Sequence, residues 1–150
     1  MLPDAIQLVI VTPERQILKE TVSEVTVPGA DGYLGVLPGH APLITELGVG
    51  ELTYRTIGDQ KGGGQNGLLA VIRGFAEVLP DRVSVLAETA EFAEDIDLTR
   101  AQEALKRAQE RIAKGGENID WDRATLSLAR ALVRINVVSK HQGVNIASAR

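Results

Sequence analysis

The hydrophobic pattern of this chain changes its period near residue 90, and this change constrains the fold more than any other feature. Before it, Val, Ile, Leu and Thr come in short runs separated by Gly, Pro and Asp, which is typical of strands joined by tight turns. After residue 95, apolar residues recur at helical spacing. The sequence therefore predicts an N-terminal β domain, residues 1–90, followed by a helical hairpin with a short tail, residues 91–150.

Short strand-like runs fill the first part, separated by turn signals such as Pro28-Gly29 and Arg73-Gly74. Many short strands at this spacing favour an antiparallel sandwich or barrel. The glycine-rich segment 58–67 has nothing to bury and is predicted to be a flexible hairpin loop. The candidate strands are residues 7–11, 16–20, 22–27, 33–37, 43–47, 51–55, 68–72, 75–79 and 83–87.

Two apolar stripes predict two antiparallel helices, with Asp97 and Asp120 as their N-caps and a turn at residues 114–118. Both stripes are rich in alanine, so each contact buries little area at about 25 cal/mol per Å². We therefore expect a weakly held hairpin that can dock, undock and extend. Residues 142–150 are predicted to be a loose tail. The stripes consist of Ala101, Ala104, Leu105, Ala108 and Ile112, and of Ala124, Leu128, Ala131, Leu132 and Ile135.

Composition excludes several classes of function. The 150 residues are 44% hydrophobic but only 3% aromatic, which predicts an aliphatic core. A net charge of −4 disfavours a general nucleic-acid binder. The lack of cysteine excludes disulfides, thiol catalysis and Cys-ligated zinc. The start of the chain has no signal-peptide pattern, and its apolar runs are too short to span a bilayer, so any membrane association is expected to be indirect.

Catalytic and phosphate-binding motifs do not assemble. The two histidines, His40 and His141, belong to no HExxH or Ser-His-Asp pattern, and a lone loop histidine is more often structural than catalytic. Glycines 62–64 lack the Lys-Ser/Thr of a phosphate loop, and those at 29, 32 and 35 do not match a dinucleotide fingerprint. The sequence therefore predicts neither an enzyme nor a metal site.

Segment 28–43 allows two interpretations. Two tight turns flanking one strand explain its Gly and Pro residues. They do not explain why Tyr33 and Leu34 stand beside a turn, where exposure is expected. Exposed apolar residues at such a place often mark a docking edge.

A second candidate site combines Arg100 with Arg130 and Arg134. The latter two are four residues apart and share one helix face. Folding the hairpin about residues 117–118 brings Arg100 opposite roughly residue 135, so three guanidinium groups converge and invite an anion. The N-terminus of the first helix adds positive dipole character. The alternative is a solvated basic face, or one paired with acids of a partner.

Six stretches, residues 8–15, 34–43, 74–78, 83–90, 96–101 and 130–134, recur in order in one family. Through them the chain resembles the epsilon subunit of bacterial F-type ATP synthase over residues 6 to about 138. The resemblance implies an α+β fold, with an antiparallel β-sandwich of about ten strands followed by a two-helix antiparallel hairpin. It also implies a non-catalytic subunit of the central stalk in a proton- or sodium-translocating enzyme.

The implied partners are the gamma subunit, the membrane c-ring and the beta subunits, with no nucleic acid and only indirect membrane contact. The implied location is the cytoplasmic face of the bacterial plasma membrane. The hairpin would lie folded, or rise along gamma and block ATP hydrolysis. When raised, Lys106, Arg107, Arg111 and Lys114 would face acids of a beta subunit; the alternative is a solvated helix face.

The resemblance also implies three contact sets. No cofactor is required, and ATP would be a regulatory ligand and not a substrate, because nothing positions an attacking water. Many relatives carry an acid where this chain has Tyr33, which favours an apolar or hydrogen-bonded c-ring contact. An alternative function is a free ATP-binding conformational sensor. The sets are Gly29, Ala30, Asp31, Gly32, Tyr33 and Leu34 for the c-ring; His40, Ala41, Pro42 and Leu43 for gamma; and Glu91, Ile96, Asp97, Arg100, Ala101, Arg130 and Arg134 for ATP.

Overall fold

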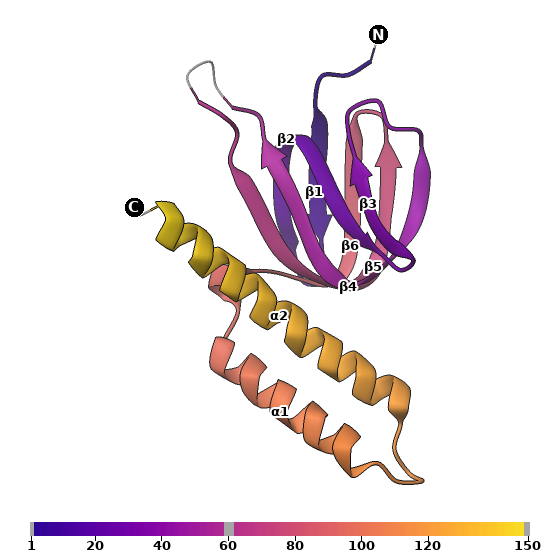
Figure 1. Cartoon of the computed structure of the whole chain (residues 1–150). Helices are drawn as coiled ribbons and strands as arrows, with labels where there is room; N and C mark the ends of the chain where they lie inside the picture. The colour runs from indigo at the N-terminus through magenta and orange to yellow at the C-terminus, as the bar shows by residue number, and fades with distance from the viewer. Residues whose placement is uncertain (1, 59–61, 149–150) are drawn as a thin grey trace. The chain divides into compact units, whose positions relative to one another are not determined.

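The computed structural model describes residues 2–58 and 62–148, the last five of these by their backbone alone. The chain forms two compact units, Met1–Glu91 and Phe92–Arg150. The first is built from strands and the second from helices (Figure 1).

Six strands of the first unit form one sheet that closes on itself. Their order is β1-β6-β5-β4-β2-β3, and β1 also pairs with β2, which completes the circuit (Figure 1). The pairing of β1 with β6 is parallel, whereas β1–β2, β2–β3, β2–β4 and β4–β5 are antiparallel. The strands are β1 Ile6–Val11, β2 Gln16–Gly29, β3 Gly32–Val36, β4 Leu43–Thr56, β5 Asn66–Leu79 and β6 Arg82–Phe92.

The predicted fold class is confirmed, but neighbouring candidate strands merge. β2, β4 and β5 each have 14 residues and span two of the predicted runs. The turn predicted at Arg73-Gly74 is wrong, because the two residues, with φ of 56° and 129°, bend β5 without ending it. A Cβ at Gly74 would collide with the carbonyl oxygen of Leu86, so glycine is required there. Local bends of this kind let long strands wrap around a core.

The core of the closed sheet is aliphatic, as predicted. Strand β1 alternates strictly, with its even-numbered residues Ile6, Leu8 and Ile10 fully buried. Large side chains of the other strands, such as Leu52 and Leu69, are also inaccessible to solvent. Among the residues whose side chains are described, no polar or charged one is buried. Burial of aliphatic area therefore holds this unit together.

The glycine-rich connection predicted over residues 58–67 joins β4 to β5, although Asn66 and Gly67 already belong to β5. Its residues 59–61 lie outside the described residues. Near the base of the loop, the backbone N–H of Thr56 donates to the carbonyl of Gln65 over 2.8 Å, and the amide of Gln65 donates to the Thr56 hydroxyl, also over 2.8 Å. These bonds fix where the loop leaves the sheet.

The second unit is a hairpin of α1, Leu98–Lys114, and α2, Trp121–Ser148, preceded by the short 3₁₀ turn η1, Ala93–Asp95. Both predicted N-caps are confirmed. The carboxylate of Asp97 accepts from the amide of Arg100, and that of Asp120 from the amide of Arg123, each over 3.0 Å. These bonds satisfy amides that a helix start leaves without partners.

The two helices lie side by side and antiparallel (Figure 1), with Gly115 and Gly116 at positive φ in the turn between them. Alanines of both stripes are buried, among them Ala108 and Ala124. The loose tail predicted for residues 142–150 is wrong at least as far as Ser148, because α2 continues to that residue. Gly143 costs only about 1 kcal/mol relative to alanine in a helix, and no proline follows to stop it. Residues 149–150 lie outside the described part.

Candidate functional sites

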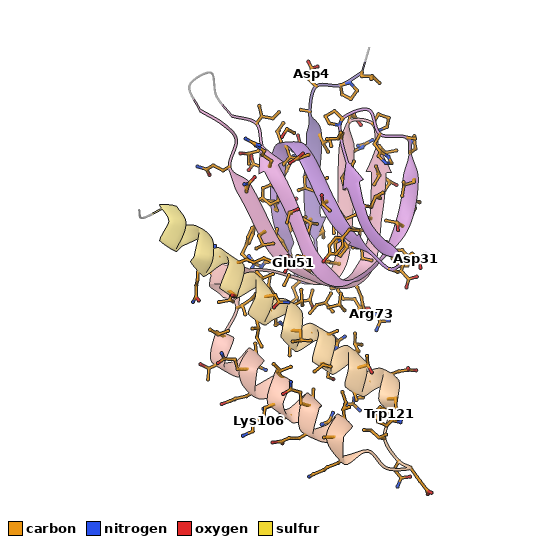
Figure 2. The ribbon with its side chains drawn as sticks, in the orientation of Figure 1. Asp4, Asp31, Glu51, Arg73, Lys106 and Trp121 are labelled. Atoms are coloured by element: carbon orange, nitrogen blue, oxygen red, sulfur yellow. The ribbon has the colours of Figure 1, made fainter. Side chains whose placement is uncertain are left out.

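The predicted c-ring contact set forms the end of the β2–β3 hairpin. Gly29 pairs with Gly32, which leaves Ala30 and Asp31 as a two-residue turn. Both turn residues are exposed, and Asp31 lies at the tip (Figure 2). The set is therefore one continuous surface feature, with a carboxylate at its tip.

Tyr33 is tied to the body of the sheet by its hydroxyl. The residue is 64% exposed, yet its hydroxyl accepts a hydrogen bond from the backbone N–H of Glu51 over 3.2 Å. The pairing of β2 with β4 is interrupted there, since Thr26 pairs with Thr53 but Gly29 with Leu47. The hydroxyl thus accepts from a backbone N–H of β4 that lies where β2 and β4 are not paired. This gives Tyr33 a structural role that its sequence position did not indicate.

The predicted gamma contact set lies in the loop before β4 and at the first residue of that strand. The amide of Gly39 donates to the carbonyl of Pro80 over 2.8 Å, and the amide of His40 to the carbonyl of Leu37 over 3.1 Å. The Nδ1 atom of His40 lies 2.7 Å from the carbonyl oxygen of Ala41, the geometry of an N–H donating to it. These bonds hold the loop in place and leave Ala41 and Pro42 exposed.

An exposed apolar patch on β4, β5 and β6 was missed by the sequence analysis. It consists of Ile44, Phe75 and Leu86, which are 72%, 56% and 57% exposed. Ile44 pairs with Glu77, and Glu46 pairs with Phe75, so Ile44 and Phe75 are diagonal neighbours on one face. The alternation Phe75-Ala76-Glu77-Val78 could have revealed this patch, because Phe75 lies on the same face of the strand as the exposed Glu77. Such a patch is typical of a docking surface.

The predicted ATP set is mostly contained in the helical unit. Asp97, Arg100 and Ala101 lie at the start of α1, where Ala101 is buried and Arg100 exposed. The backbone carbonyl of Asp97 accepts from the amide of Ala101 over 3.0 Å. Ile96, half-buried, immediately precedes the cap. The backbone on this side of the set is therefore fixed by the helix start.

The other members of the set are Arg130 and Arg134 on α2 and Glu91 at the end of the first unit. Arg130 and Arg134 are half-buried and one helical turn apart. Each takes part in an interaction within the protein, so neither residue is without a partner. Glu91 belongs to the other unit and is not placed against the rest of the set.

Two further findings concern metals and membranes. Over the described ranges, no group of three or more His, Cys, Asp or Glu side chains is arranged to hold a metal ion. Among the helical residues that the structure covers, no stretch is both long enough and apolar enough to cross a bilayer.

Two family models cover most of the chain. Residues 5–93 match the β-sandwich domain of the ATP synthase delta/epsilon chain, and residues 94–139 match its long α-helix domain. A curated relative from Solibacter usitatus, named ATP synthase epsilon chain, is 45% identical over 139 residues, which cover 93% of this chain and 99% of the relative. One of the same name from Koribacter versatilis is 50% identical over 113 residues, 75% of each chain.

Solved structures show the same fold. A chain of the Euglena gracilis mitochondrial ATP synthase, in a structure of its OSCP/F1/c-ring, superposes with a TM-score of 0.76 at 23% identity, over 95% of this chain and 84% of that chain. A chain from the central stalk and c-ring of the Tetrahymena thermophila enzyme gives 0.51 at 12% identity, over 91% and 95%.

The closed sheet and helical hairpin, matched domain by domain, define a subunit of an ATP synthase that is not itself catalytic. The chain belongs to the ATP synthase delta/epsilon chain family. The resemblance inferred from six separated motifs is thereby confirmed.

Proposed function

We propose that this subunit couples rotation of the central stalk to the catalytic head and restrains ATP hydrolysis through its helical hairpin. The observation that carries the proposal is the division of the chain into two units with different kinds of packing. Large aliphatic side chains are fully buried in the closed sheet, whereas many of the buried residues of the hairpin are alanines. A hairpin held by small contacts can change its position at low energetic cost.

Contacts with the neighbouring subunits follow from the exposed segments. The hairpin end 29–34 would contact the c-ring, with Asp31 at the tip and Tyr33 fixed by its hydrogen bond. Residues 40–43 would contact gamma, extended by the apolar patch of Ile44, Phe75 and Leu86. The location would be peripheral, on the cytoplasmic face of the membrane, in a proton- or sodium-driven enzyme. When raised, the hairpin would reach the beta subunits.

ATP would act as a regulatory ligand of the folded hairpin. Arg100, Arg130 and Arg134 would hold phosphate oxygens, with Arg130 and Arg134 exchanging their present interactions for those with the ligand. Ile96 and Ala101 would pack against the base, and Glu91 and Asp97 would accept hydrogen bonds. By mass action, ATP would then favour the conformation that binds it.

The test is ATP hydrolysis by the assembled complex, with the full chain and with residues 92–150 deleted, over a range of ATP concentrations. We expect severalfold faster hydrolysis after the deletion, with assembly preserved because the closed sheet has its own core. Equal rates at every ATP concentration would contradict the proposed restraint. Loss of gamma from the complex would contradict the proposal that the sheet unit carries the gamma contacts.

ATP binding is tested separately by calorimetry on the full chain. Binding that is lost in the Arg100→Ala, Arg130→Ala double variant would support the nucleotide site. If the free chain binds ATP but the deletion leaves hydrolysis unchanged, the alternative of a conformational ATP sensor is favoured. Absence of ATP binding would leave rotational coupling and restraint by the hairpin, without nucleotide control.

A further inference from the structure

The turn of the helical hairpin contains a cleft lined by cations. This open cleft of about 620 Å³ lies between the last turn of α1 and the first turn of α2. Arg111 and Lys114 line it from α1, and Arg123 lines it from α2. Its two acids are Glu117 and Asp120, and the carboxylate of Asp120 already accepts from the amide of Arg123 over 3.0 Å.

The three cations of this cleft lack ion-pair partners within the described residues. The C-terminal end of α1 favours Arg111 and Lys114, because a helix C-terminus carries partial negative charge. Arg123 has no such explanation, since it lies in the first turn of α2, where the helix dipole disfavours a cation. Its exposed guanidinium group is therefore available to a ligand in the cleft.

The shape and charge of the cleft select a class of ligand. Guanidinium groups bind phosphate oxygens through paired hydrogen bonds, and a lysine adds a point charge. A concave site of a few hundred Å³ is typical of small ligands, whereas an acidic protein surface needs no hollow to meet exposed cations. We propose that this cleft binds a phosphate-bearing anion, supplied either as inorganic phosphate or pyrophosphate or as the polyphosphate of a nucleotide.

This site is separate from the predicted ATP set. Arg123 precedes Arg130 by seven residues on α2, about 10 Å along the helix axis. Arg100 precedes Arg111 by eleven residues on α1, about 16 Å along its axis. An anion in the cleft would join the ends of the two helices and offset the repulsion among the three cations. It would thereby stabilise the hairpin by mass action.

The experiment uses the full chain and inorganic pyrophosphate at physiological ionic strength, followed by calorimetry. The fluorescence of Trp121, the only tryptophan, which starts α2 beside the cleft, is a second readout (Figure 2). The double variant Arg111→Gln, Arg123→Gln is compared with Lys106→Gln, Arg107→Gln, which removes two exposed charges of α1 that do not line the cleft. Circular dichroism checks that both variants keep their helices.

We expect pyrophosphate to bind roughly tenfold or more weakly to the cleft variant and with unchanged affinity to the control. The same titrations with orthophosphate and ATP distinguish the two sources of the anion. Absence of pyrophosphate binding, or equal weakening in both variants, would overturn the proposal. A glutamate-rich peptide that binds at these cations while pyrophosphate does not would overturn it in favour of a protein partner. The hydrolysis test of the hairpin deletion is independent of all these outcomes.

Discussion

The two units of this protein are stabilised in different ways. The closed sheet buries whole Leu, Ile and Val side chains, each worth about 1.5–3 kcal/mol. The hairpin buries mainly alanines, whose single methyl groups contribute only about 0.8 kcal/mol each, together with Val133, Val137 and Val138 of α2. Local capping bonds at Asp97 and Asp120 offset part of the lower burial energy of the hairpin. The comparison indicates that the closed sheet is a rigid platform, and that the helical hairpin joined to it can open at a moderate cost in free energy.

The largest effect is expected in the core of the platform. Leu52→Ala removes a fully buried side chain from β4 and leaves a cavity, so the unfolding free energy should fall by about 2–5 kcal/mol. Leu86→Ala, on the exposed face of β6, should change it by less than about 0.5 kcal/mol. Urea denaturation of both variants measures the contrast. Similar losses in both would mean that the core is not where the platform is stabilised.

A smaller effect is expected at the start of the hairpin. Asp97→Ala removes the side-chain acceptor for the amide of Arg100 and should lower the stability of α1 by about 1 kcal/mol. Asp97→Asn keeps an acceptor at this position and should lose much less. Hydrogen exchange of the α1 amides reports the difference. If protection of β-sheet amides fell equally, the two units would not be independent.

Removal of the hydrogen bond that joins Tyr33 of the β2–β3 hairpin to β4 should have a more local effect. Tyr33→Phe removes the acceptor for the backbone N–H of Glu51, a bond worth about 0.5–1.5 kcal/mol at most, since Tyr33 is exposed. We expect faster exchange of the Glu51 amide and little change in global stability. An unchanged exchange rate at Glu51 would show that the hydroxyl does not hold this part of β4.

The smallest effect is expected for the contact between His141 and Glu94 in the second unit. Nε2 of His141 lies 3.6 Å from Oε1 of Glu94, and both side chains are substantially exposed. Exposed pairs contribute little, so Glu94→Gln should change the stability of the hairpin by less than about 1 kcal/mol. Thermal unfolding of the two forms checks this. A larger loss of stability would show that the contact between Glu94 and His141 holds η1 against α2.

Local chemistry determined what the sequence could predict. Both caps, the turn with Gly115 and Gly116 and the aliphatic core follow from rules that act over a few residues. The division of β5 into two runs failed, because Gly74 and its neighbour bend a strand that its pairing with β4 keeps continuous. The predicted tail failed as well, since neither Gly143 nor a proline ends α2 before Ser148.

The same distinction between local and long-range interactions applies to the candidate sites. Exposure of Ala30 and Asp31 could be predicted from turn chemistry, whereas the bond from the amide of Glu51 to Tyr33 joins residues 18 apart and leaves no local signal. Arg130 and Arg134 also interact within the protein, which the sequence argument for three converging, uncompensated charges did not foresee. Pairwise contacts of this kind require the folded chain.

The central claim is that the hairpin opens independently of the platform. Hydrogen exchange of the full chain, followed amide by amide, tests it most directly. We predict that α1 and α2 exchange through an opening that costs several kcal/mol less than the opening of the paired strands β4 and β5. Equal protection of helices and strands, lost together in denaturant, would contradict the account, because the chain would then be one cooperative unit.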